Sequence, residues 1–179
     1  MSEVVVRRFV GADTVETVEV FKAIYAATSG SYPLLRECSD AAVETWLANK
    51  KWFGRWVAVA GSGTAKRVVG HVGSCSAASD TSRALWTDAL GVETHKLSVI
   101  SRLGVSPAAQ RSGVAWNLLK AAVEQAQVAG NTAVLDVAAS NVTAIRLYQA
   151  FGFEIVATST GSWDGKPLEI AVLVYCEKK

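Results

Sequence analysis

The feature that most restricts the fold is a strand, a helix and a second strand that follow one another closely in the second half of the chain. Residues 95–105 have the length and composition of a strand, and residues 112–129 place apolar side chains at helical spacing. Gly130 and Asn131 end this helix. Residues 132–137 (TAVLDV) are almost continuously apolar, which is typical of a strand covered on both faces. The segment therefore predicts one crossover unit within a sheet.

The rest of the chain alternates between periodic segments and turn residues. We expect strands over 4–9, 55–60, 67–76, 153–159 and 168–176, and helices over 14–28, 40–47, 81–90 and 141–151. The glycine-rich segments 61–66 and 161–167 are expected to be a hairpin turn and a loop. This order predicts a mixed α/β fold and one domain over residues 1–179.

Composition excludes several classes of protein. Half of the residues are hydrophobic, 19% are charged and the net charge is +2. This is a globular composition with no large charge excess for a nucleic-acid partner, and no apolar run reaches the roughly 18 residues of a membrane span. The N-terminal residues read as a strand, without a cleavable signal.

The cysteines and histidines predict neither disulfides nor a metal site. Cys38, Cys75 and Cys176 are odd in number and far apart, and His71 and His95 lack the close spacing of a helical metal pair. We therefore expect reduced thiols, a cytoplasmic location and no metal.

The loop sequence Gln110-Arg111-Ser112-Gly113-Val114-Ala115 joins the expected strand to the expected helix. Backbone N–H groups have no regular partner at a helix start, and the helix dipole adds partial positive charge there. A glycine allows a phosphate to come close to the backbone, and the arginine and glutamine add donors. The loop predicts an anion site, with an ordinary polar loop as the alternative.

Three segments together resemble the GNAT superfamily of N-acetyltransferases. Residues 105–115 (VSPAAQRSGVA) are similar to its acetyl-CoA signature Q/R-x-x-G-x-G/A, preceded by a strand end. Residues 141–153 (NVTAIRLYQAFGF) are similar to its N-x-x-A-x-x-[LI]-Y-x-x-x-G-F segment, and residues 70–73 (GHVG) resemble its preceding hairpin strand. The resemblance covers roughly residues 55–176.

This resemblance implies a twisted mixed sheet flanked by helices and splayed between strands 95–105 and 132–138. It implies acetyl-CoA as the acyl donor, with pantetheine along the first strand edge and pyrophosphate on the loop. The implied cofactor-binding residues are Leu103, Gly104, Val105, Gln110, Arg111, Ser112, Gly113, Val114, Ala115, Asn141, Ala144 and Tyr148.

The resemblance also implies the chemistry, which is direct attack by a primary amine on the thioester. Tyr148 is the expected general acid for the CoA thiolate, because a phenol stays protonated at neutral pH. The alternative is a core tyrosine packed with Phe151. The Val105 N–H is the implied oxyanion donor. Strand 96–105 lacks the acid of many family members, so the base is left open between Glu93, His95, Glu37 and water.

The sequence does not choose the amine. A small molecule, an amino acid, an antibiotic or a peptide N-terminus all fit, and the acyl-chain preference and a homodimer are also open. Trp46, Trp52 and Trp56 are expected either to line an acceptor pocket or to pack in the core or an interface. The rival functions are a non-catalytic acyl-CoA-binding module and a nucleotide-phosphate enzyme. The second lacks a recognisable Walker-type lysine.

Overall fold

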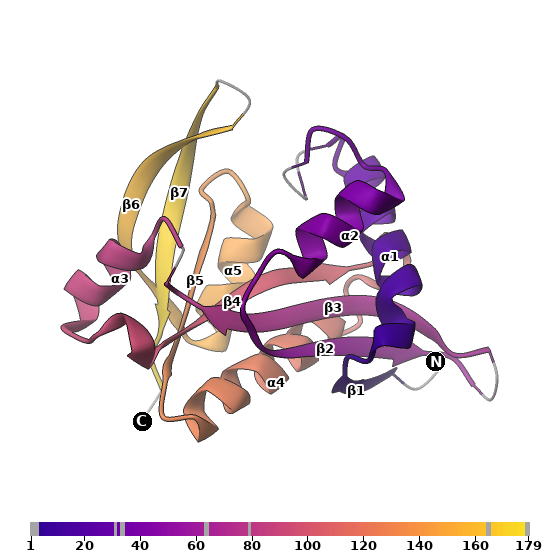
Figure 1. Cartoon of the computed structure of the whole chain (residues 1–179), viewed down its shortest axis with the longest axis horizontal. Helices are drawn as coiled ribbons and strands as arrows, with labels where there is room; N and C mark the ends of the chain where they lie inside the picture. Colours follow the sequence, from indigo (N-terminus) through magenta and orange to yellow (C-terminus); the bar gives the residue numbers. More distant parts are fainter. Residues whose placement is uncertain are drawn as a thin grey trace. The chain divides into compact units, whose positions relative to one another are not determined.

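A single mixed sheet runs through the computed structural model, with seven strands in the order β1-β2-β3-β4-β5-β7-β6 (Figure 1). The structure describes residues 4–30, 32, 35–62, 65–78, 80–163 and 166–177. The strands are β1 (Val4–Arg8), β2 (Trp52–Ala60), β3 (Arg67–Ser76), β4 (Leu97–Val105), β5 (Thr132–Ala138), β6 (Phe153–Trp163) and β7 (Lys166–Tyr175). The helices are α1 (Thr14–Ala27), α2 (Asp40–Ala48), α3 (Arg83–Leu90), α4 (Val114–Val128) and α5 (Val142–Phe151).

The chain divides into two compact units. The first contains Met1–Cys75 and Ser101–Gln125, and the second contains Ser76–Ile100 and Ala126–Lys179. Strand β4 and helix α4 therefore each contribute residues to both units. That residues 1–179 form one domain stays a prediction.

In the first unit, β1, β2 and β3 pair in antiparallel fashion, for example Val6 with Ala58 and Val57 with His71. Helices α1 and α2 cover one face of these strands, and α4 covers the other (Figure 1). The core on the α1 side is built from side chains that are at most 7% exposed. They are Val18, Val20, Phe21, Ile24, Val43, Leu47, Val57 and Val68.

Two glycines bring both helices close to the strands of this unit. A Cβ atom at Gly104 of β4 would lie 2.6 Å from the ring of Phe21 in α1. A Cβ atom at Gly70 of β3 would lie 2.9 Å from Leu118 in α4. Side chains at these two positions would push the helices outward, so the packing of both faces requires glycine at both positions.

In the second unit, β4 and β5 pair in parallel at Leu97–Thr132, Ser98–Ala133 and Val99–Val134. Strand β5 then pairs antiparallel with β7, and β7 with β6. Helix α3 contacts both β6 and β7, and its Trp86 is fully buried. The crossover unit and the mixed α/β class predicted from the sequence are confirmed.

The largest difference from the sequence prediction is in the last hairpin. Residues 161–167 were expected to form a loop, but Gly161 pairs with Leu168 and Ser162 with Pro167. Pro167 is tolerated because the pairing of β7 with β5 begins only at Ile170, so its missing N–H interrupts no bond to β5. Helix α4 begins at Val114 rather than residue 112, since Gly113 has a left-handed φ of 80°.

Among the described residues, no helix combines the length and the hydropathy needed to cross a membrane.

We predict that Gly104→Ala lowers the free energy of unfolding by about 1–3 kcal/mol, because the added methyl group overlaps the buried Phe21 ring. Gly11→Ala is the matched control, since a Cβ atom there would meet nothing within 4 Å. Urea unfolding of both variants measures the difference. Equal transition midpoints in the two variants would contradict the packing argument.

Candidate functional site

The loop between β4 and α4 presents backbone N–H groups that have no acceptor among the described residues. This holds for the N–H groups of residues 111–115, and the first bond of the helix runs from Asn117 N to Gly113 O at 3.1 Å. These groups stand at the positive end of the α4 dipole. The loop can therefore donate several hydrogen bonds to one anion.

The backbone conformation of the loop favours such a site. Arg111 and Gly113 both have left-handed φ angles, of 61° and 80°. Left-handed residues on either side of Ser112 turn successive N–H groups toward one side, as in anion-binding nests. A Cβ atom at Gly113 would meet nothing within 4 Å, so a ligand atom can approach the backbone there.

Side chains of the loop hold it in place. The Gln110 Nε2 donates to Val105 O at 3.4 Å, and the Ser112 hydroxyl donates to Ala109 O at 2.6 Å. The Ser106 N–H donates to Val69 O of β3 at 2.8 Å. Gln110 was expected to add a side-chain donor and Ser112, as a small residue, to leave space for the ligand; in this structure both side chains bond to the loop itself. Arg111 is exposed and supplies the positive side chain.

Tyr148, in the second unit, lies in an apolar environment. It is 9% exposed, and its ring packs edge-on against Phe153 with centroids 5.9 Å apart. Burial, with a smaller contribution from the charge of Asp136, raises the pKa of the Tyr148 hydroxyl above its usual value. No described residue forms a hydrogen bond with this hydroxyl. The phenol therefore keeps its proton at neutral pH, and that proton is not committed to another group of the described chain.

Asn141 and Ala144 lie at the start of α5, the helix that carries Tyr148. The Asn141 Oδ1 accepts a hydrogen bond from Ala144 N at 3.2 Å, so Asn141 caps α5 as the sequence predicts. Capping uses the side-chain carbonyl and leaves the amide NH₂ as a donor.

The acids considered as the base are all on the surface. The Glu93 Oε2 lies 3.0 Å from the His95 Nδ1 on the surface just before β4. Glu37 is also exposed, and its Oε1 accepts from the Ser39 hydroxyl at 2.8 Å. None of the three has a buried setting that would favour a proton-accepting role.

Sequence reasoning missed a group of polar side chains on the α1 face of the first unit. Arg102 of β4 is 8% exposed, and its guanidinium lies 4.6 Å from the Trp46 ring and 5.1 Å from the Trp52 ring. Arg102 lies within the strand that the sequence predicts over residues 95–105, where a single arginine gives no local signal of a site. Trp46 and Trp52 thus share one cation, whereas Trp56 lies under Arg8 instead.

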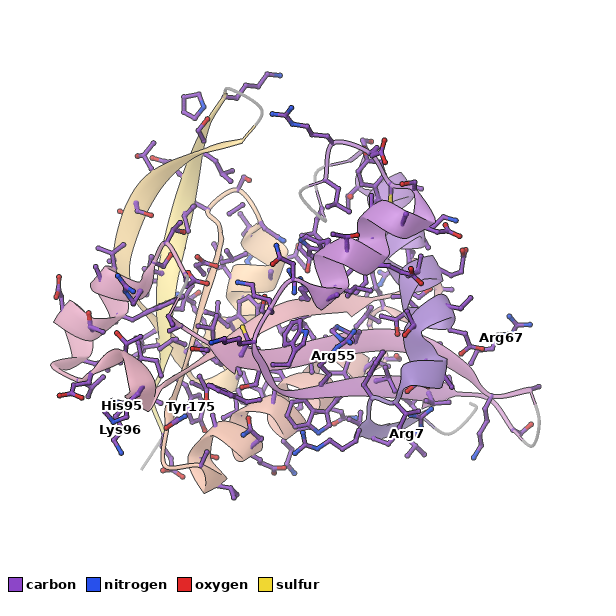
Figure 2. The ribbon with its side chains drawn as sticks, viewed as in Figure 1. Arg7, Arg55, Arg67, His95, Lys96 and Tyr175 are labelled. Atoms are coloured by element: carbon purple, nitrogen blue, oxygen red, sulfur yellow. The ribbon has the colours of Figure 1, made fainter. Side chains whose placement is uncertain are left out.

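His71 connects Arg102 to a second arginine. The His71 Nδ1–H donates to Arg102 O at 3.0 Å, since a carbonyl can only accept, and Arg55 Nε donates to His71 Nε2 at 3.1 Å. Nδ1 is therefore the donor and Nε2 the acceptor of the ring, and the imidazole is neutral. Figure 2 shows Arg55 over the middle of β2 and β3, whereas Arg67 projects away from the ribbon. Burial, aided by the two guanidinium charges, lowers the pKa of His71 to about 3.

A mixed sheet with a loop of N–H donors between a strand and a helix suits a ligand that carries phosphate groups. The sequence model of the Acetyltransferase (GNAT) family matches residues 21–153, and the chain belongs to this family. It is therefore an N-acetyltransferase.

Solved structures of other proteins share the fold. Ribosomal-protein-alanine N-acetyltransferase from Brucella melitensis is 17% identical, with a TM-score of 0.70 over 95% of this chain and 98% of that chain. Arabidopsis thaliana NAA60 in complex with acetyl-CoA is 20% identical, with a TM-score of 0.69 over 97% and 98%. A GCN5-related N-acetyltransferase from Kribbella flavida is 18% identical, with a TM-score of 0.66 over 94% and 96%. No curated protein sequence matches the chain.

We predict that His71 makes the protein less stable as the pH falls below about 6.5. The unfolded chain binds a proton at the usual histidine pKa, whereas the folded chain does so only near pH 3. The free energy of unfolding should therefore fall by up to about 1.4 kcal/mol per pH unit, which urea unfolding between pH 7 and 5 measures.

Two variants separate this effect from other titrations. His71→Gln should flatten the slope between pH 6.5 and 5, while His95→Gln, which changes the exposed histidine, should retain it. An unchanged slope in His71→Gln would show that another group causes the pH dependence.

Proposed function

We propose that the protein moves the acetyl group of acetyl-CoA to a primary amine, without a covalent enzyme intermediate. The observation that supports this most directly is the row of N–H groups at residues 111–115, which have no acceptor among the described residues. Such a row suits the pyrophosphate of a CoA molecule, and the exposed Arg111 adds charge.

The donor set of the loop fits this cofactor. Residues 110–115 would hold the pyrophosphate, with the open space at Gly113 admitting a phosphate oxygen. The main chain of Leu103, Gly104 and Val105 would pair with the pantetheine arm, as a peptide pairs with a strand edge. The Leu103 carbonyl also accepts from the Tyr32 hydroxyl at 3.3 Å, which fixes this part of β4. Acetyl-CoA would supply the thioester that the amine attacks.

Asn141 and Ala144 are proposed to form part of the cofactor-binding wall. The free amide NH₂ of Asn141 is available as a donor, because only its carbonyl oxygen caps α5. Ala144 is half-buried and small, which leaves room beside the helix start.

Tyr148 is the proposed general acid. Its raised pKa keeps the hydroxyl protonated through the pH range in which amines are acetylated, so a proton is always available for the departing thiolate. The same raised pKa makes Tyr148 a weaker acid than an exposed phenol. Donation of a strong hydrogen bond is therefore favoured over complete proton transfer until charge develops on the sulfur.

The remaining steps are assigned to the main chain and to water. The Val105 N–H is the proposed donor to the oxygen that becomes negative during attack. The acids nearest β4 in sequence are exposed and paired, which favours loss of the ammonium proton to water.

We predict that Gly113→Glu abolishes binding of acetyl-CoA, measured by calorimetry with ATP as the comparison ligand. The new side chain would fill the open space of the loop with a negative charge. Gly91→Glu is the matched control, since Gly91 has a similar φ of 62° and open space but follows α3. Normal affinity of Gly113→Glu for acetyl-CoA would refute the assignment of the loop.

We predict that Tyr148→Phe binds acetyl-CoA normally but releases thiol about 10²–10⁴-fold more slowly in the presence of an acceptor amine. Tyr175→Phe should keep full activity, because Tyr175 and Tyr148 both pack against Phe153. Equal turnover of wild type and Tyr148→Phe would remove the general-acid role. Binding of acetyl-CoA without turnover of any amine by the wild type would favour the non-catalytic module instead.

A further inference from the structure

The Arg102 guanidinium is a buried cation without a counter-ion. No carboxylate of the described residues pairs with it, and its one hydrogen bond, to Leu47 O, is 3.5 Å long. That distance lies outside the usual range of N–H···O bonds. Burial lowers the pKa of Arg102 to about 10; the ionisable Cys75 and Tyr32 act in the opposite direction, and the charge of Arg55 contributes a smaller lowering. The nitrogens without a partner remain in contact with solvent, since none is among the enclosed unpaired atoms.

Aromatic rings hold this guanidinium in place. Trp52 donates from Nε1 to Leu47 O at 3.1 Å, so the indole and Arg102 share one carbonyl. The Trp52 ring lies against the backbone of Gly73, where a Cβ atom would collide with it. Trp46 in turn packs edge-on against Phe21, with centroids 5.0 Å apart. The cation is therefore positioned before any ligand arrives, which reduces the cost of binding one.

A second positive charge, that of Arg55, acts on Arg102 in addition to the ionisable Cys75 and Tyr32. Arg55 is partly buried, stacks 3.7 Å from the Phe9 ring and forms no ion pair among the described residues. Asp13, the acid whose charge acts on Arg55, is engaged by Arg7 through two bonds of 2.7 Å. His71 lies between the two guanidiniums and is neutral. Neither Arg102 nor Arg55 forms an ion pair with a carboxylate of the described residues.

We propose that Arg102 binds the carboxylate of the amine acceptor, so that the acceptor is a free amino acid with an apolar side chain. A guanidinium has a planar fork of donors that matches a carboxylate, and the Trp46 and Trp52 rings offer an apolar surface beside it. Arg102 directly precedes Leu103, which places the ligand beside the strand end proposed to hold the thioester. A protein N-terminus carries a neutral peptide bond where the amino acid has its carboxylate, and would lack this ion pair.

The proposal rests on the proposed acetyl transfer, and one set of substrates tests both. L-methionine, L-leucine and L-phenylalanine are each compared with the corresponding amide in a thiol-release assay. The amide differs only in lacking the negative charge, and its amine is the less basic, so chemical reactivity alone would favour the amide. We expect kcat/KM to be about 10²-fold or more higher for at least one acid than for its amide, mainly through KM.

Variants of Arg102 test whether this residue recognises the carboxylate. Arg102→Gln should remove the preference for the acid and leave the affinity for acetyl-CoA unchanged. Arg102→Lys keeps the charge without the planar fork and should show an intermediate loss. Arg8→Gln is the matched control, because Arg8 also stacks on a tryptophan but is exposed.

Calorimetric titration of the three acids separates this proposal from the proposed function. Acids that bind the wild type but not a folded Arg102→Gln would support the carboxylate site even if no acetyl transfer were observed. Normal acetyl-CoA binding and turnover, with acids and amides used equally well, would overturn the carboxylate site and leave acetyl transfer intact. Equal binding of the acids by wild type and Arg102→Gln, or no binding by either, would also overturn it.

Discussion

The packing of the first unit depends on the close approach of helices α1 and α4 to glycine residues in strands β4 and β3. Gly104 admits the Phe21 ring on one face of the strands, and Gly70 admits Leu118 on the other. Because Gly104 is next to Val105, the same contact that packs α1 also sets the end of β4. The loop that follows is then tied to β3 through the Ser106 N–H. A change in the packing of α1 against β4 should therefore also change the geometry of the loop between β4 and α4.

The first unit contains two sets of hydrogen-bond donors that have no strong acceptor among the described residues. The N–H groups of residues 111–115 form one such set, and the guanidinium of Arg102 is another. Every helix start has N–H groups without internal acceptors, and exposed ones bond to water, whereas a buried guanidinium without a carboxylate partner is uncommon. The oriented N–H groups and the buried guanidinium together support anion recognition in this unit.

The sequence predicted the parts of the fold that local patterns control. The crossover unit was predictable because apolar periodicity, a stop at Gly130 and a buried strand agree with one another. The cap at Asn141 was predictable for the same local reason. The end of the last hairpin was not, since Gly161 and Pro167 are turn residues and only pairing across β6 and β7 makes them strand.

The candidate site divides in the same way. The loop of residues 110–115, proposed to bind pyrophosphate, could be found from its position between a strand and a helix. Arg102 could not be assigned from the sequence, because its partners Trp46 and Trp52 are far from it along the chain. The internal bonds of Gln110 and Ser112 were also hidden, since a donor side chain in a loop looks the same whether it serves a ligand or the backbone.

The positive character of β4 has a consequence for proton transfer. An ammonium group close to a guanidinium is destabilised, because like charges favour the neutral form and lower the pKa of the amine. Arg102 and Arg55 would act on a nearby amine in this direction. A strand without a carboxylate can thus still promote loss of the ammonium proton, because its positive charge repels the ammonium group, whereas a carboxylate would accept the proton directly. The positive charge of the two guanidiniums would then take the place of the acid that many relatives have in this strand, and water would be a sufficient proton acceptor.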